Sequence, residues 1–288
     1  MLEEISSLGF EYAELSHGIR ISLVPGVLRA VEEGIIKIST VHNFCPLPMG
    51  VTKSAPNIFQ FSSSDRQQRE NAYRQTLKTL DFAAKVEARL VVLHCGSVEM
   101  PDFSEKLEIL VEKGQLGSPK FAKVMEKALK IRENKKSRHL EWVQETVSRL
   151  VPEARQRNLW LGVENREAIE ELPFDADFDL FFQGLDPEVV KYWHDCGHAQ
   201  IKERMGLLHH RIHLEGQADR LAGFHIHDVK PPLKDHRAPG TGMIDFAELA
   251  SFVRPEHLKV FEMSPKLSRG DVVTGVEHVL HHWQTSNK

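Results

Sequence analysis

Short apolar runs alternate with longer amphipathic stretches along nearly the whole chain, and this alternation is the feature that most restricts its fold. The apolar runs are rich in β-branched and aromatic residues and are bounded by polar residues or glycine, which predicts strands. They span residues 10–16, 35–44, 88–96, 159–165, 189–198, 221–229 and 258–265. The clearest helical patterns between them span residues 65–87, 140–157, 245–253 and 271–283. Strands that alternate with helices pair in parallel, and the helices pack outside the sheet.

Two architectures fit this alternation, a doubly wound open sheet and a closed barrel. Polar residues recur at the end of nearly every predicted strand, and a shared function requires them to converge. A barrel brings all strand ends together on its C-terminal face, whereas an open sheet does so only near one switch point. We therefore predict an α/β fold of the TIM (β/α)8 type. A chain of 288 residues is of a size that forms such a barrel, so we expect one domain over residues 1–288.

The pattern departs from an eight-stranded barrel in two places. Only seven strand-like runs are present, and the helix-like stretch LEEISSL precedes the first of them, so the first strand of the barrel is apparently missing. An incomplete barrel would expose the edges of strands 10–16 and 258–265, which would offer a place for a partner such as a second copy of the chain. Residues 102–139 form a charged, helix-prone insertion. This insertion is either a solvated excursion or a lid over the C-terminal face.

Composition excludes several classes of protein. The net charge of −4 argues against a nucleic-acid partner. The N-terminus MLEEISSLGF has neither the positive nor the apolar region of a secretory signal, and no apolar run reaches the length of a membrane span. Three widely spaced cysteines do not make a disulfide framework. These features predict a cytoplasmic protein without a membrane association.

Four residues that close successive strands are candidate metal ligands: Glu164 in LWLGVE, Asp195 in VVKYWHD, His225 in LAGFHIHD and Glu262 in LKVFE. They are separated by 31, 30 and 37 residues, so each strand–helix unit delivers one of them. Any one of them alone is more often a helix cap or an ion-pair partner, but all four recur in phase. Three converging carboxylates repel one another unless a cation lies between them. Oxygen-rich ligation with one imidazole suits Mn²⁺, Mg²⁺, Co²⁺ or Zn²⁺.

A second set of histidines lies near these positions and could bind a second metal or substrate hydroxyl groups. It consists of His42, His94, His198, His227 and His236. The alternation of a strand places His194 on the opposite side from Asp195, toward the helices. We expect His209, His210, His213, His281 and His282 to lie on helix surfaces, and Cys45, Cys95 and Cys196 to be packing residues. The loop PGTGMIDF at 239–246 either cradles a phosphate or is a flexible loop before a helix capped by Asp245.

Several segments together resemble the xylose isomerase-like TIM barrel superfamily, which includes sugar isomerases, sugar epimerases and the endonuclease IV type of nuclease. The matching segments are GFEYAELS, VHNFCPLP, LVVLHCGS, LGVEN, HDCGH, FHIHDVK with HRAPGTGMIDF, and VFEMSP. They run from residue 9 to 265, so the resemblance covers nearly the whole chain. It implies that Glu164, Asp195, His225 and Glu262 are the shared metal ligands.

The resemblance implies an isomerase or epimerase that acts on a small sugar or sugar phosphate. In such enzymes, the glutamates that correspond to Glu164 and Glu262 also move the proton. The metal polarises the substrate carbonyl and hydroxyl, and an enediolate forms. His198 would orient the substrate.

Three alternatives remain. The first is an endonuclease IV-like zinc phosphodiesterase that cleaves abasic DNA, for which the outer histidines would supply further ligands. Lys234 stands where that branch has an aspartate, with Asp235 adjacent, and HIHD replaces its HxND motif. The second is a metal-dependent lyase or dehydratase with the same ligands. The third is a barrel without catalytic activity.

Overall fold

The computed structural model describes all residues except 52, 56 and 286–288. The described residues form two compact units. Unit 1 comprises Met1–Ser97, Arg138–Glu164 and Asp179–Lys191, and unit 2 comprises Val98–Ser137, Asn165–Phe178 and Tyr192–Lys288. No helix in the described part of the chain combines the length and the apolarity that crossing a membrane requires.

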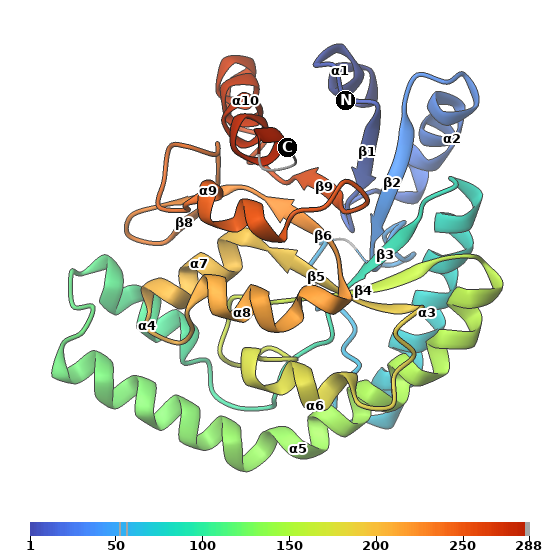
Figure 1. Ribbon diagram of the computed structural model, residues 1–288. Coiled ribbons are helices and arrows are strands. Elements are labelled where there is room, and N and C mark those ends of the chain that lie inside the picture. Colours follow the sequence, from blue (N-terminus) through green and yellow to red (C-terminus); the bar gives the residue numbers. More distant parts are fainter. Residues whose placement is uncertain (52, 56, 286–288) are drawn as a thin grey trace. The chain divides into compact units, whose positions relative to one another are not determined.

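Unit 1 is built on parallel strands in the order β1-β2-β3-β4 (Figure 1). Helix α1 packs on β1, and α3 packs on β2 and β3. All four residues of β3 are buried, as is typical of a parallel strand covered on both faces. The elements are α1 (Leu2–Ser7), β1 (Tyr12–Leu15), α2 (Val24–Glu32), β2 (Lys37–His42), α3 (Arg66–Lys85), β3 (Leu90–Leu93), β4 (Trp160–Glu164) and, beginning at the unit boundary, α6 (Phe178–Phe182).

Unit 2 continues with parallel strands in the order β5-β6-β9 and adds an antiparallel hairpin of β7 and β8. Helix α7 packs on β6 and the hairpin, and α10 packs on α9 (Figure 1). The elements are α4 (Ser104–Glu112), β5 (Val190–Asp195, whose first two residues are in unit 1), α7 (Cys196–Arg204), α8 (His210–Gln217), β6 (Leu221–Ile226), β7 (Asp228–Lys230), β8 (Lys234–Arg237), α9 (Phe246–Leu249), β9 (Leu258–Phe261) and α10 (Arg269–Thr285).

The described residues contain seven parallel strands, the number that the sequence predicts, and helix α1 precedes the first of them. The hairpin β7–β8 is a difference. The sequence predicts one strand over residues 221–229, but β6 ends at Ile226 and the chain then turns back on itself. β7 pairs with the antiparallel strand β8 and not with a parallel neighbour, so residues 228–230 belong to a hairpin and not to an extension of β6.

The charged insertion is not a separate element. Residues 119–156 form one 38-residue helix, α5 (Pro119–Gln156), that continues through the boundary predicted near residue 139. The segment contains no glycine, and Lys, Glu, Ala, Leu and Arg favour a helix throughout it. Within unit 2, α4 and the first half of α5 have buried inner faces that include Leu107 and Ala128. A fully solvated excursion would lack such faces, so that interpretation is wrong.

Buried polar contacts hold this insertion to the segment that follows β4. Arg132, fully buried, donates to the carbonyl oxygen of Ile169 and to the carboxylate of Asp177 over 2.8 Å and 2.5 Å. Glu170 accepts hydrogen bonds from the backbone N–H of Phe103 (2.7 Å) and the hydroxyl of Ser104 (2.6 Å). The insertion therefore supports the loop 165–178, which starts immediately after the candidate ligand Glu164.

Candidate metal centre

In unit 1, a carboxylate or imidazole side chain stands at or near the C-terminal end of each strand. Glu14 lies in β1, His42 ends β2, His94 follows β3 and Glu164 ends β4. Because parallel strands end at the same edge of a sheet, these side chains meet. Nε2 of His42 is 3.3 Å from Oε1 of Glu14, and Nε2 of His94 is 2.5 Å from Oε2 of Glu164. The rings of His42 and His94 are 5.2 Å apart.

Glu14, and His17 next to this group, are not among the residues that we predicted from sequence. The ring of His17 lies 5.7 Å from that of His42 and 6.4 Å from that of His94. Glu14 is held in place because the hydroxyl of Thr40 donates to its Oε2 over 2.6 Å. A signal was available, since Glu14 is a carboxylate within a short strand that is otherwise apolar near its C-terminal end, a costly position without a partner.

In unit 2, three of the four predicted ligands lie together. Nδ1 of His225 is 3.6 Å from Oδ2 of Asp195 and 3.1 Å from Oε2 of Glu262. One ligand atom from each of the three lies within 4.8 Å of the others. Asp195 and His225 are fully buried, whereas the side chain of Glu262 is 34% exposed. Two carboxylates around one imidazole are a donor set that fits a divalent cation.

Asp195 is fixed by contacts on several sides. Its carboxylate accepts a hydrogen bond of 2.7 Å from the backbone N–H of His198 and thereby caps helix α7. Asn165 donates to its backbone carbonyl and accepts from its backbone N–H. Burial by itself raises the pKa of Asp195, but electrostatic attraction to His198 and His227 and hydrogen bonds from His225 and His227 hold it well below its ordinary value. Asp195 is therefore an anion, the form that binds a metal.

Both ring nitrogens of His227 are engaged by hydrogen-bonding partners within unit 2. Its Nδ1 accepts a hydrogen bond of 2.9 Å from the backbone N–H of His236, so the proton of the neutral ring is on Nε2. Nε2 lies 3.1 Å from the carboxylate of Asp195 and can donate to it. We therefore assign His227 to holding Asp195 in place rather than to direct binding of a second metal.

His236 stacks on His227, with ring centroids 4.2 Å apart and an angle of 8° between the planes. Its Nδ1 is 2.8 Å from a carboxylate oxygen of Asp235, and its Nε2 is 3.9 Å from Glu262. Burial lowers the pKa of His236, but the hydrogen bond and charge of Asp235 and the charge of Glu262 together raise it to about 9. His236 is one of three residues with candidate ligand atoms grouped within 4.8 Å, together with His227 and Glu262.

His198 belongs to another group in unit 2. Ligand atoms of Glu167, His198 and Asp235 lie within 4.8 Å of one another, and Nδ1 of His198 is 3.0 Å from the carbonyl oxygen of Asn165. Asp235, and not Lys234, is thus the residue of β8 that takes part in such a group. In the sequence, Lys234 weakens the case for a further metal, but its acidic neighbour supplies a carboxylate at the relevant place.

Two histidines that the sequence pattern places on helix surfaces are buried instead. His210 is 4% exposed, and the side chain of His213 is 6% exposed, whereas that of His209 is 59% exposed as expected. Nε2 of His210 lies 2.8 Å from Nε2 of His194, and the hydroxyl of Tyr192 is 2.9 Å from Nδ1 of His194. His194 faces helix α8, as the strand alternation predicts. Its partners could not be predicted because a short helix such as α8 shows no clear period in sequence.

In the loop at 239–246, the amide groups of Gly242 and Ile244 are already engaged and are not offered to a phosphate. The backbone N–H groups of Gly242 and Ile244 donate to the carboxylate of Asp228 over 2.7 Å and 3.1 Å. A Cβ on Gly242 would lie 2.3 Å from that carboxylate, so glycine is needed there for close packing. Asp245 caps helix α9, as predicted, by accepting from the N–H groups of Ala247 and Glu248.

The three cysteines are buried and free. Burial raises the pKa of Cys45 to about 12 and raises those of Cys95 and Cys196 above their ordinary value. Thiols with a raised pKa carry little thiolate and are poor nucleophiles. This finding agrees with their predicted role as packing residues.

Comparison with known proteins identifies the family. A model of the xylose isomerase-like TIM barrel family matches residues 2–266. A D-tagatose 3-epimerase-like protein has a similar structure, with 16% identity, a TM-score of 0.72, and coverage of 99% of this chain and 92% of the other. No protein with a curated description matches the chain.

Two further solved structures have the same fold. The 3-keto-D-glucoside 4-epimerase YcjR from E. coli shares 15% identity with a TM-score of 0.66, and 97% of this chain and 92% of that one are covered. The IolI protein with a bound zinc atom shares 13% identity with a TM-score of 0.66, and the coverage is 98% and 92%. The predicted resemblance and barrel fold are confirmed: this chain belongs to the xylose isomerase-like TIM barrel family.

Proposed function

We propose that the protein is a divalent-metal-dependent sugar isomerase or epimerase in which Glu164 and Glu262 transfer the proton. The observation that carries this proposal is the set of Asp195, His225 and Glu262, which combines two carboxylates and one imidazole within 4.8 Å at the ends of three strands. Several structural neighbours are named as sugar epimerases, which supports the same class of reaction.

We include Glu164 in the proposed ligand set because of its position at the end of the strand that precedes β5. It ends β4, as Asp195 ends β5, and strand ends share one face in a TIM barrel. This part of the proposal requires that both units act together, so it includes the prediction that residues 1–288 form one domain. A bound Mn²⁺, Mg²⁺, Co²⁺ or Zn²⁺ ion would polarise the carbonyl and hydroxyl groups of the sugar.

The two glutamates differ in their surroundings, and this difference suggests separate roles. Glu262 is partly exposed and can remove a proton from a carbon next to the carbonyl of a bound sugar, which leaves an enediolate. Glu164 is buried at 1% exposure beside Nε2 of His94, and it would return the proton to the opposite face in an epimerase. His198, fixed by the carbonyl of Asn165, would hold a substrate hydroxyl.

Exchange of the substrate proton with solvent tests the proposal. The protein is incubated with a panel of keto-sugars and Mn²⁺ in D₂O, and deuterium at the carbon next to the carbonyl is measured by mass spectrometry. We expect Glu262→Gln to reduce exchange by about 10²–10⁴-fold, the usual contribution of a general base. Glu248→Gln, which alters an exposed glutamate of α9, should leave it unchanged. Absence of deuterium uptake across the panel with metal bound would refute the proposal.

A zinc phosphodiesterase of the endonuclease IV type is the second candidate, and specific contacts favour it. His42 and His94 lie together in unit 1, and Asp235 joins His198 in unit 2, so more than one metal could be bound. Metal content together with cleavage of an abasic duplex, measured on protein purified without chelator, tests this candidate. Two or three ions with cleavage support the nuclease, whereas absence of cleavage at any metal content rules it out.

A further inference from the structure

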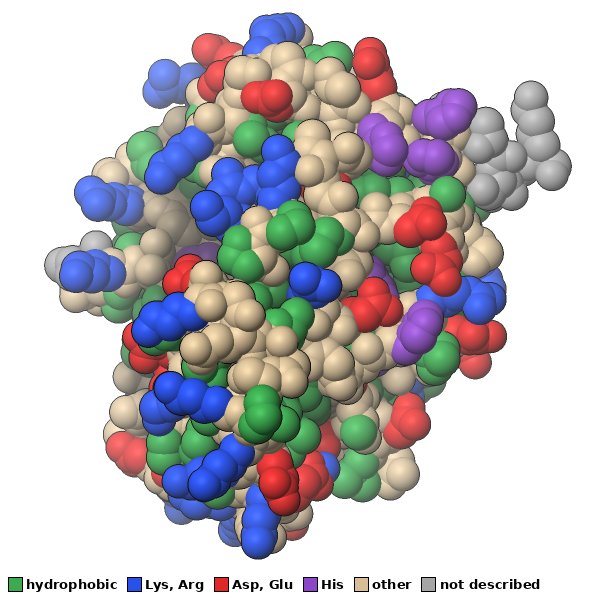
Figure 2. All heavy atoms as spheres, turned by 90° about the vertical axis from the view of Figure 1, so that its left-hand side faces the viewer, with side chains coloured by type: hydrophobic (Ala, Val, Ile, Leu, Met, Phe, Trp, Pro, Cys, Tyr) green, Lys and Arg blue, Asp and Glu red, His purple; other side chains and the backbone are tan. Residues whose placement is uncertain are grey.

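Helix α10 carries a group of histidines outside the proposed centre. His278, His281 and His282 lie in its C-terminal half, and their side chains are partly or largely exposed. Histidine side chains gather at the surface in Figure 2. The ring centroids of His278 and His282 are 4.9 Å apart, and those of His281 and His282 are 5.2 Å apart. None of the three belongs to the candidate metal groups found among the described residues.

The spacing of His278 and His282 suits a metal ion. Residues four positions apart lie one above the other on the same face of a helix. Two imidazoles arranged in this way form the metal-binding pair of helical zinc motifs. Imidazole nitrogen is a good ligand for Zn²⁺, Ni²⁺ and Cu²⁺ but a poor one for Mg²⁺ or Ca²⁺. A pair of this kind can therefore bind borderline transition-metal ions, with water or a further side chain completing the coordination.

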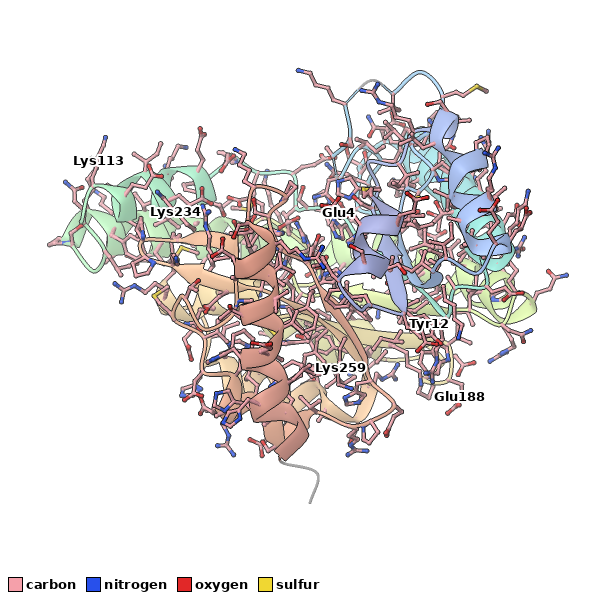
Figure 3. The ribbon with its side chains drawn as sticks, turned by 90° about the horizontal axis from the view of Figure 1, so that it is seen from above. Glu4, Tyr12, Lys113, Glu188, Lys234 and Lys259 are labelled. Atoms are coloured by element: carbon pink, nitrogen blue, oxygen red, sulfur yellow. The ribbon has the colours of Figure 1, made fainter. Side chains whose placement is uncertain are left out.

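The helix holds this pair on a rigid support. Val279 and Trp283 are 1% and 3% exposed, and Nε1 of Trp283 donates to the carbonyl oxygen of Phe246 over 2.8 Å. The face of α10 next to the pair is therefore anchored in unit 2, and Figure 3 shows α10 in the foreground at the outside of that unit. Because the backbone is already fixed, little conformational entropy is lost when a metal orders the two rings.

His278 is also fixed by its neighbours. A Cβ on Gly240 would lie 2.8 Å from the imidazole ring of His278, so this glycine makes room for the ring. Partial burial, followed by the charge of His282, lowers the pKa of His278 below its ordinary value despite the opposing charge of Asp228. A lowered pKa keeps the ring neutral, the protonation state in which imidazole binds metals.

We propose that His278 and His282 form a second, peripheral site for a transition-metal ion such as Zn²⁺, Ni²⁺ or Cu²⁺, with water completing the coordination. The site is independent of the proposed catalytic centre, because it shares no residue with Glu164, Asp195, His225 or Glu262. It therefore stands even if the chain proves not to be an isomerase.

Zinc binding by the full-length protein tests this site. The number of Zn²⁺ ions bound per chain is measured by equilibrium dialysis and elemental mass spectrometry over a range of free Zn²⁺. We expect the double variant His278→Ala/His282→Ala to bind one ion fewer than the unaltered protein at saturation. Each single variant should weaken this binding at least about tenfold, the loss of one of two ligands. His209→Ala removes an exposed histidine next to another helix and should change nothing.

The outcomes are separable from those of the isomerase test, because the measurement counts metal ions and does not depend on activity. Equal zinc binding by the double variant and the unaltered protein would overturn the proposal. If the alanine variants fail to fold, as judged by circular dichroism, the variant His278→Gln/His282→Gln keeps polar side chains of similar length. It should fold and still lose the ion, and its retention of the ion would overturn the proposal equally.

Discussion

The buried histidine pair His194 and His210 should make the protein sensitive to mild acid. Their Nε2 atoms are 2.8 Å apart, so one ring donates and the other accepts, and the two rings cannot both be protonated. Burial, together with the charge of His213, lowers the pKa of His210 from 6.5 to about 3. Burial and the charges of His210 and His213 place the pKa of His194 well below 6.5 as well.

The sign of the effect follows from proton binding. Below its ordinary pKa, His210 takes up a proton in the unfolded chain but not in the folded protein, so acid favours unfolding. The stabilisation that neutral His210 provides is fully present well above pH 6.5. It is lost as the pH falls below 6.5, and it stops changing near pH 3, where the folded protein also takes up the proton. One pH unit below 6.5, about 1.4 kcal/mol is lost for one such group. His194 should contribute a similar amount.

Urea unfolding followed by circular dichroism at about pH 7.5 and about pH 5.5 measures this effect. His210→Gln keeps a polar group near His194 but removes the titrating ring. The variant should therefore lose about 1.3 kcal/mol less than the unaltered protein between the two pH values. His209→Gln, at an exposed neighbouring position, is the matched control and should behave like the unaltered protein. The same pH dependence in all three proteins would refute the reasoning.

Two substitutions test the packing around the proposed centre. Arg132→Met should reduce the free energy of unfolding by about 3–5 kcal/mol, because it leaves the buried carboxylate of Asp177 without its main partner. Arg132→Lys keeps the charge and should reduce the free energy of unfolding by less. Equal losses for the two variants in urea titrations would contradict this account. A Cβ on Gly197 would lie 2.0 Å from the ring of His227, which contacts Asp195. Gly197→Ala should therefore destabilise the protein by about 1–3 kcal/mol and lower its metal content. Gly26→Ala, which adds a methyl group in open space within α2, should do neither, and a stable, metal-replete Gly197→Ala protein would contradict the packing argument.

The strand–helix order and the residues that close the strands can be predicted from sequence, because both depend on local pattern. The helices predicted over residues 65–87 and 271–283 correspond to α3 and α10, with ends within two residues at each terminus. The continuity of the insertion with the helix predicted over residues 140–157 could not be predicted. Both halves of α5 consist of residues that favour a helix. The halves differ in which other parts of the chain they contact, and local sequence does not specify those contacts.

The partners of the polar residues depend on distant parts of the chain. Glu14 lies 28 positions before His42, and His227 reaches Asp195 from another strand. Neither contact leaves a periodic trace in the sequence, because each depends on the register of parallel strands and not on spacing along one segment. For the same reason, sequence alone could not distinguish His210, which is buried, from its exposed neighbour His209.

The sequence by itself determined the class of fold, the family and the positions of the candidate ligands Glu164, Asp195, His225 and Glu262. These follow from alternation and from side-chain chemistry at strand ends, which local residues specify. Only the tertiary structure decided that His227 supports Asp195, that Asp235 and not Lys234 joins His198, and that Asp228 occupies the amides of the glycine loop. Such assignments require knowledge of which hydrogen-bonding atoms face each other, and folding alone brings those atoms together.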